Sequence, residues 1–89
     1  MNSINKLFWL PRFGRDYRKL SSGAKEKVNN TLLRMENNLH HPSLVVKKLK
    51  GAQDIWEARA SDSLRITFNL KANEIYLRTV GEHDVLKNI

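Results

Sequence analysis

Hydrophobic positions recur every three or four residues in the first half of the chain, which is the spacing of amphipathic helices. Residues 13–20 show it first, with aromatic and leucine side chains on one side and basic side chains on the other. A second apolar stripe, about four turns long, is preceded by Ser21, Ser22 and Gly23 as candidate N-cap residues and is ended by Asn37, Asn38 and the His40-His41-Pro42 sequence. The stripe consists of Ala24, Val28, Leu32, Met35 and Leu39. We therefore expect two consecutive helices that form an αα-hairpin.

The second half of the chain changes to a period of two, which is typical of half-buried strands. Apolar and polar residues alternate over residues 56–60, 64–70 and 74–80, and short connections between these segments favour an antiparallel meander. A further apolar segment, Leu7 to Leu10, is stopped by Pro11 and is expected to be a first strand near a sheet edge. The order of elements predicts an α+β fold, an antiparallel sheet of about four strands with two N-terminal helices packed on one face.

The alternation also separates a covered face of the predicted sheet from an open one. Arg59 and Arg65 point to the open face, and Tyr76 and Arg78 can join them there. Two arginines on adjacent strands repel unless an anion lies between them, and Glu57 is a candidate for that partner. An internal Arg–Glu pair and a surface that binds an external anion therefore both stay open. Expected beneath the helices are Leu64, Ile66, Phe68, Leu70, Ile75 and Leu77.

The 89 residues, without repeats or linker-like stretches, are expected to form one domain, residues 1–89. They include 16 Lys and Arg against nine Asp and Glu, a formal net charge of +7. Such an excess destabilises a compact domain by self-repulsion and therefore indicates an anionic partner. For a small basic domain, we expect this partner to be nucleic acid. A basic surface that is merely solvated is the alternative.

Several classes of function are disfavoured. The chain has no cysteine, which removes disulfide frameworks and thiolate chemistry. Its N-terminal residues lack the pattern of a signal peptide, and no stretch approaches the ~20 apolar residues of a membrane span, so we expect a cytoplasmic protein without a membrane partner. His40 and His41 are adjacent and cannot share a helix face as metal ligands, so neither a metal nor another cofactor is expected.

Two segments carry candidate chemistry. Lys47, Lys48 and Lys50 form a basic cluster before the strand at 56–60, in position for phosphate contacts at the mouth of the open face. His83 follows the last predicted strand, next to Asp84, and a histidine suits proton transfer near neutral pH. A solvated lysine loop and an exposed histidine without a role are the alternatives.

In succession, these segments resemble the RelE/ParE superfamily of toxins from bacterial toxin–antitoxin systems. The Gly-x-His segment is most similar to the RelE and YafQ-like branch, whose members cleave mRNA, usually on the ribosome and without a metal. The resemblance implies a bacterial cytoplasmic endoribonuclease in which a ribose 2′-hydroxyl attacks the neighbouring phosphate, with a cognate antitoxin, mRNA and the ribosome as partners. It rests on Leu7 to Leu20, Lys48 to Gly51, Ile55 to Arg59, Leu64 to Ile66 and Val80 to Asp84.

The same resemblance implies roles for single residues. His83 matches the histidine of the Gly-x-His segment and would act as acid or base, and Arg65 matches the strand arginine that holds the phosphate. Arg59 stands where YafQ-like toxins carry a histidine, which implies phosphate clamping or proton transfer. The residues expected to bind and position RNA are Lys47, Lys48, Lys50 and Arg78.

The sequence departs from the family pattern at two places. Leu86 and Lys87 occupy the stretch where many members carry an aromatic residue, and Ser63 and Leu64 stand where YafQ-like members have an Asp–Trp pair. Two other functions therefore stay open. One is ParE-like inhibition of DNA gyrase without hydrolysis, and the other is a catalytically weak module that binds only an antitoxin or RNA.

Overall fold

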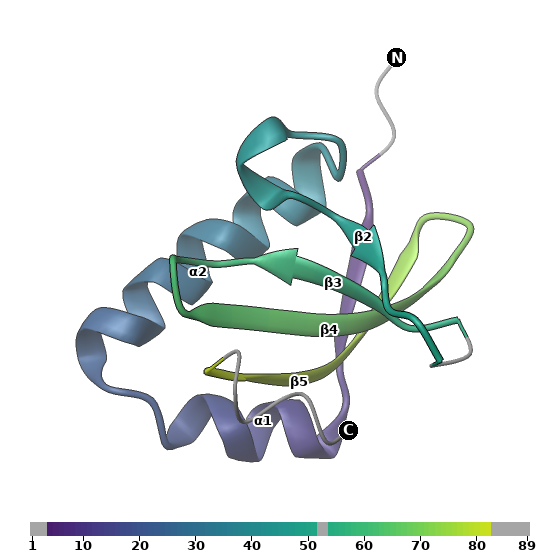
Figure 1. Ribbon diagram of the computed structural model, residues 1–89. Helices are drawn as coiled ribbons and strands as arrows, with labels where there is room; N and C mark the ends of the chain where they lie inside the picture. Colours follow the sequence, from purple (N-terminus) through teal and green to yellow (C-terminus); the bar gives the residue numbers. More distant parts are fainter. Residues whose placement is uncertain (1–3, 52–53, 83–89) are drawn as a thin grey trace.

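The computed structural model describes residues 4–51 and 54–82, in which two α-helices, one 3₁₀ helix and five strands are found (Figure 1). In chain order these are β1 (Lys6–Trp9), α1 (Pro11–Arg18), α2 (Ser22–Asn37), η1 (Pro42–Leu44), β2 (Lys47–Lys48), β3 (Trp56–Arg59), β4 (Leu64–Lys71) and β5 (Glu74–Glu82). The predicted α+β class is confirmed. No helix in the described part of the chain is long and apolar enough to cross a membrane.

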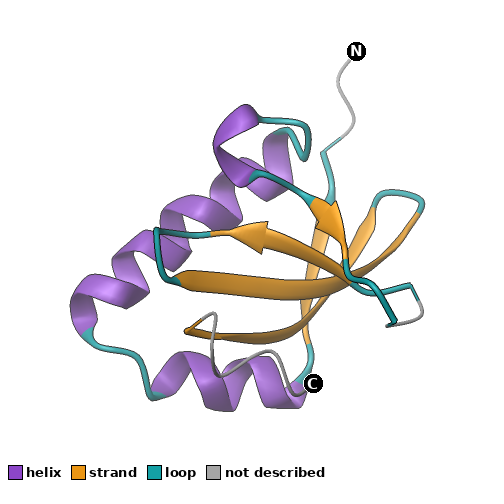
Figure 2. Ribbon diagram, in the orientation of Figure 1, coloured by secondary structure: helices purple, strands orange, loops and turns teal. Residues whose placement is uncertain are grey.

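The strands form one sheet in the order β1-β5-β4-β3-β2 (Figure 2). Strands β3 to β5 form the predicted antiparallel meander and β2 extends it, whereas β1 pairs with β5 in parallel and forms one edge. The opposite edge is β2, at Lys47–Lys48, which we expected to be part of a loop. Two paired residues are too few for hydrophobic alternation to reveal a strand, so the sheet has one strand more than the roughly four predicted.

Local chemistry explains where the helices begin. Pro11 is the first residue of α1, where its fixed φ suits the helix and its missing N–H has no partner to lose. The side chain of Ser21 accepts a hydrogen bond from the backbone N–H of Ala24 at 3.1 Å, which confirms the predicted N-cap of α2. The two helices pack on one face of the sheet, as predicted, and bury their apolar sides in a shared core.

One hydrophobic core joins the helices to the sheet. The buried residues are Phe13, Val28, Leu32, Met35, Leu44, Ala58, Leu64, Ile66, Phe68, Ile75, Leu77 and Val80. Leu70, which we expected beneath the helices, is instead 38% exposed. The reason is that α2 ends at Asn37, and Leu70 borders an open hollow with Asn37 and Asn38 at that end of the sheet.

A bulge in the β4–β5 hairpin changes which residues of β5 face the core. Thr67 pairs with Thr79 and Phe68 pairs with Leu77, so Arg78 is an extra residue without a direct partner. On a regular strand, residues three apart face opposite sides of the sheet. The bulge allows both Leu77 and Val80 to be buried in the core and turns Arg78 away from it.

Candidate functional site

The side of the sheet opposite the core carries most of the predicted cationic residues, and we call it the polar face. It is defined by Glu57, Arg59, Arg65, Thr67, Asn69, Tyr76, Arg78 and Thr79. Arg59 and Arg65 are direct partners across β3 and β4, as expected from the alternation of both strands. Opposed arginines are unfavourable unless each has an anionic partner, so the surrounding carboxylates determine what this face can bind.

A buried carboxylate lies in the middle of the polar face. Glu57 is only 5% exposed, and its Oε1 atom lies 3.8 Å from Lys47 Nζ and 3.8 Å from Arg65 Nε. Lys47 is on the same face because it pairs directly with Glu57 across β2 and β3. Burial of a carboxylate is costly without compensating charge, which these two cations supply. Of the two alternatives that the sequence left open, the structure contains the internal pair of Glu57 with Arg65.

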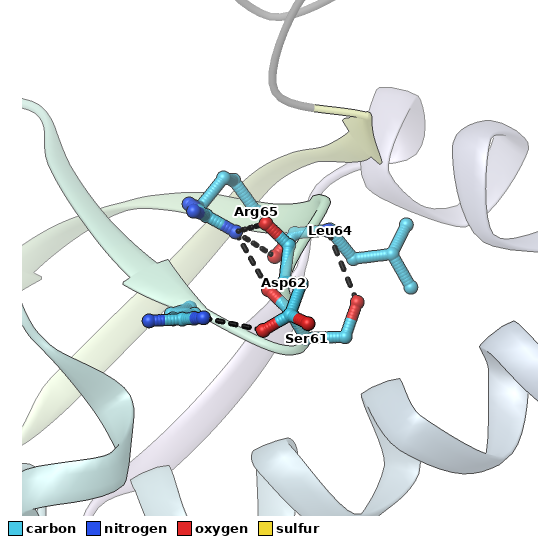
Figure 3. A network of polar contacts seen from close by, with 5 residues as sticks. Ser61, Asp62, Leu64 and Arg65 are labelled. Atoms are coloured by element: carbon cyan, nitrogen blue, oxygen red, sulfur yellow. Dashed lines mark hydrogen bonds and ion pairs between the residues drawn. The ribbon is translucent and has the colours of Figure 1, made fainter.

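Arg65 is held in one orientation by the turn between β3 and β4. Its Nη1 atom lies 2.7 Å from the carbonyl oxygen of Ser61, 3.1 Å from that of Asp62 and 3.0 Å from that of Leu64 (Figure 3). Only 17% of the side chain is exposed. Because a guanidinium group is planar and its donors are rigidly placed, contacts on both the Nη1 and Nε sides preorganise it for an anion.

Arg59 has a partner that a ligand can replace more easily than the partners of Arg65. Its Nη2 atom lies 2.5 Å from Asp62 Oδ1, and the two side chains are 42% and 100% exposed. An ion pair this exposed contributes little to stability, so a phosphate group can replace Asp62 at small cost. Separate carboxylates thus relieve the repulsion between Arg59 and Arg65, and Arg59 is paired with Asp62 rather than with Glu57.

The remaining predicted RNA-binding residues are separated by the fold. Lys48 pairs with Trp56, so strand alternation turns its side chain to the face opposite that of Lys47. Lys50 is exposed beyond the end of β2. Arg78 donates a hydrogen bond from Nη1 to Asn69 Oδ1 at 2.8 Å, which keeps it on the polar face. The structure therefore brings Lys47, Arg59, Arg65 and Arg78 together and leaves Lys48 apart.

The predicted catalytic histidine, His83, and its neighbour Asp84 lie outside the described residues. The last described pairs of the hairpin join Arg65 to Gly81 and Leu64 to Glu82. Strand β5 therefore ends beside Arg65, one residue before His83 in the sequence. The role of His83 stays a prediction.

The polar face also carries an aromatic pair. Tyr76 was expected there, and the ring of Phe8 stacks on it with centroids 5.1 Å apart and planes 16° apart. Sequence reasoning missed Phe8 because its segment is apolar at every position, so alternation does not show which residues turn outward. The parallel pairing of Phe8 with Tyr76 supplies that information.

The phenol of Tyr76 is held by a hydrogen bond. It donates to Glu74 Oε1 at 2.7 Å, and this bond is the main cause that raises the pKa of Tyr76 above its ordinary value of 10.0. Tyr76 therefore remains protonated near neutral pH and serves as a donor and a ring surface rather than a base. In the described part of the chain, no three His, Cys, Asp or Glu side chains are grouped so that they could hold a metal ion.

No protein-family model and no curated protein matches this chain, whereas solved structures share its fold. YafQ from E. coli strain BL21(DE3) has a TM-score of 0.79 and 15% identity, covering 93% of this chain and 98% of that chain. RelE in the RelB-RelE antitoxin-toxin complex from Methanococcus jannaschii has a TM-score of 0.74 and 16% identity, covering 91% and 95%. The YoeB/ParE toxin from Agrobacterium tumefaciens has a TM-score of 0.72 and 17% identity, covering 88% and 98%.

These likenesses extend over almost the whole described chain and over almost the whole of each neighbour. The chain therefore has the fold of the RelE/ParE-like toxin superfamily. The resemblance identified from its sequence is confirmed at the level of the fold. Because identities among such neighbours are only 11–21%, the shared fold does not by itself establish the activity.

Proposed function

We propose that this protein is the toxin of a type II toxin–antitoxin system and acts as a metal-independent, ribosome-dependent mRNA endonuclease in the bacterial cytoplasm. The observation that carries the proposal is the preorganised guanidinium of Arg65, with Lys47 and Arg59 beside it on one sheet face. This grouping offers planar and mobile donors to a single phosphate group. The fold shared with YafQ and RelE supports the same reading.

The proposed reaction is an internal transesterification of RNA. The ribose 2′-oxygen forms a bond to the adjacent phosphorus, and the bond from phosphorus to the 5′-oxygen breaks. The products are a 2′,3′-cyclic phosphate and a 5′-hydroxyl. A base must take the proton from the 2′-hydroxyl and an acid must give one to the departing 5′-oxygen. His83 is the candidate for one of these steps, because histidine is the residue type best suited to proton transfer near neutral pH.

The cations have a different part in this reaction. Negative charge increases on the non-bridging oxygens as the phosphorane forms, and fixed donors aimed at those oxygens lower the barrier. Arg65 supplies the fixed donors, while Arg59 exchanges Asp62 for the substrate. Lys47 and Arg78 neutralise phosphates of the RNA on either side of the phosphate held at Arg65. Lys50 lies close enough in sequence to β2 to extend that row of cations.

An antitoxin is the expected protein partner. The RelB-RelE complex supports this expectation, since the toxin of the same fold is bound there to its antitoxin. A net charge of +7 favours an acidic segment that covers the polar face. Such a segment would compete directly with RNA for Arg59 and Arg65.

ParE-like inhibition of DNA gyrase is the second candidate, because the YoeB/ParE toxin from Agrobacterium tumefaciens has the same fold. A module that binds an antitoxin or RNA without cleavage is the third, and the absence of an aromatic residue at Leu86 and Lys87 favours it. Both predict intact mRNA after induction. Gyrase inhibition additionally predicts a DNA-damage response.

The deciding experiment maps the 5′ ends of a defined mRNA by primer extension in a bacterial translation extract, with and without ribosomes. We expect new ends only when ribosomes are present. His83→Ala and Arg65→Ala should each slow cleavage by about 100-fold, the usual worth of a proton-transfer group or an oxyanion donor. Intact mRNA with the wild-type protein would contradict the proposal.

Two further variants separate loss of chemistry from loss of folding. Arg65→Lys keeps the positive charge but loses the planar donors and their contacts with the turn carbonyls, so both its rate and its thermal unfolding temperature should fall, and the rate is measured at a temperature where the variant is folded. Arg18→Ala removes one positive charge from α1, away from the polar face, and should leave the rate unchanged. Equal rates for Arg65→Lys and the wild type would show that charge alone is needed at this position.

A further inference from the structure

Two stacked aromatic rings lie on the β1 side of the polar face. Phe8 and Tyr76 are direct partners in the parallel β1–β5 pair, and their rings form an offset stack. Phe8 is 40% exposed, and its strand is the edge of the sheet. The outer side of the Phe8 ring therefore faces away from every strand, where a further flat group can continue the stack.

This pair has no evident role in the core. The neighbouring ring of Trp9 turns the other way and packs edge-on against Phe13 and Tyr17 of α1. Phe8 is directed away from the helices and packs on Tyr76. The hydrogen bond from Tyr76 to Glu74 holds the ring of Tyr76 in place, so the stack with Phe8 is formed before any ligand binds.

The distance from the stack to Arg65 suits a single-stranded nucleic acid. Tyr76 pairs with Asn69, which is four residues from Arg65 along β4, or about 13 Å at the usual rise per strand residue. Arg78 lies between them, bonded to the side chain of Asn69. A strand whose phosphate is held at Arg65 would thus pass one further cation and reach the rings within a few nucleotides.

We propose that Phe8 and Tyr76 form a stacking subsite for an unpaired nucleobase of the RNA, a few nucleotides from the phosphate held at Arg65. This inference rests on the proposed function and names a part of the substrate that it leaves open. Aromatic faces beside a line of cations are the usual way in which proteins hold single strands. The exposed ring of Phe8 and the Arg78 cation on the same face support an RNA strand as the occupant.

The test is a titration with a short single-stranded RNA in which every 2′-hydroxyl is methylated, so that it cannot be cleaved, and one base is 2-aminopurine. Stacking quenches the fluorescence of 2-aminopurine. We expect quenching by the wild-type protein and by Phe8→Trp. Phe8→Leu keeps an apolar side chain but loses the ring face, and should bind about 10-fold more weakly with little quenching.

Leu33→Ala is the matched control, because it removes an exposed apolar side chain from α2, away from the polar face. It should bind and quench as the wild type does. The same variants are compared by primer extension in the translation extract. Of these variants, only Phe8→Leu should show a changed base preference near the cleavage site, because only this variant loses the subsite. Thermal unfolding confirms that each variant is folded.

The outcomes separate this inference from the proposed function. If Phe8→Leu matches the wild type both in quenching and in its pattern of cut sites, the subsite is wrong while the endonuclease stands. If Phe8→Leu instead weakens only antitoxin binding, the rings belong to a protein interface and the subsite is again overturned. If the wild-type protein neither binds nor cuts RNA, both proposals fail.

Discussion

At the scale of single residues, Glu57 organises the cationic surface of this protein. It is the buried member of a row in which Lys47 and Arg65 lie on either side of one carboxylate oxygen. An internal anion at this position keeps the cations close together before a substrate arrives. It also competes with the substrate phosphate for the same donors, so Glu57 should affect binding and catalysis in opposite directions.

We therefore predict that Glu57→Gln binds RNA more tightly but cleaves it more slowly. Loss of one negative charge takes the net charge from +7 to +8 and removes the competitor for Arg65. The catalytic rate should fall at least about 10-fold, because the guanidinium loses one of the contacts that orient it. Fluorescence anisotropy with uncleavable RNA measures the affinity, and single-turnover cleavage on programmed ribosomes measures the rate.

The matched control is Glu26→Gln, which makes the same change of charge at an exposed position of α2. Tighter binding by both variants would attribute the effect to net charge alone. A parallel loss of affinity and rate in Glu57→Gln would mean that the carboxylate is needed only to keep the sheet folded.

At the scale of the elements, α2 is the main apolar support of the sheet, since it buries Val28, Leu32 and Met35 in the core. Its start depends on Ser21, whose side chain binds a backbone N–H of the first turn. Without that bond, one donor at the helix N-terminus loses its partner. The cap therefore contributes to the stability of the whole domain.

Ser21→Ala should reduce the free energy of unfolding by about 1 kcal/mol, the usual value of an N-cap side chain. Urea denaturation followed by circular dichroism measures the change. Ser21→Asp should restore stability, because aspartate caps equally well, while Ser22→Ala at the next position is the control and should be almost neutral. A Ser22→Ala effect as large as that of Ser21→Ala would refute the assignment of the cap.

At the scale of the whole molecule, the net charge of +7 matters through its distribution over the two faces of the sheet. Lys47 and Lys48 are adjacent in sequence but belong to opposite faces, because they pair with Glu57 and Trp56, respectively. Of the two, only Lys47 lies beside Arg65. Variants of these two lysines therefore distinguish a direct contact with RNA from the general attraction of RNA to a basic protein.

The salt dependence of RNA binding tests this distribution. Each phosphate neutralised on a single strand contributes a slope of about −0.7 to the plot of log affinity against log salt concentration. Lys47→Ala should make the slope shallower by roughly that amount, whereas Lys48→Ala should leave it almost unchanged. Equal changes in both variants would show that RNA does not distinguish the two faces.

Much of the candidate site could be predicted from the sequence. Arg59, Arg65 and Glu57 lie on regular alternating strands, so their shared face followed from local periodicity, whereas the structure decided that Glu57 pairs with Arg65. Phe8 could not be placed in this way, because every residue around it is apolar. The predicted role of His83 comes from its position after the last predicted strand, the chemistry of histidine and the resemblance.

The sequence by itself determined the two helices, four of the five described strands and the inward side of β4, because these depend on the pattern of apolar residues over a few turns or pairs. Only the tertiary structure decided that β1 lies beside β5, that Lys47 and Lys48 separate, and that a bulge places Thr79 opposite Thr67 and Val80 in the core. Those features depend on the register between segments far apart in the chain. Local periodicity contains no information about which distant residue is the partner, so the positions of Lys47 and Phe8 on the polar face became visible only once the strands were paired.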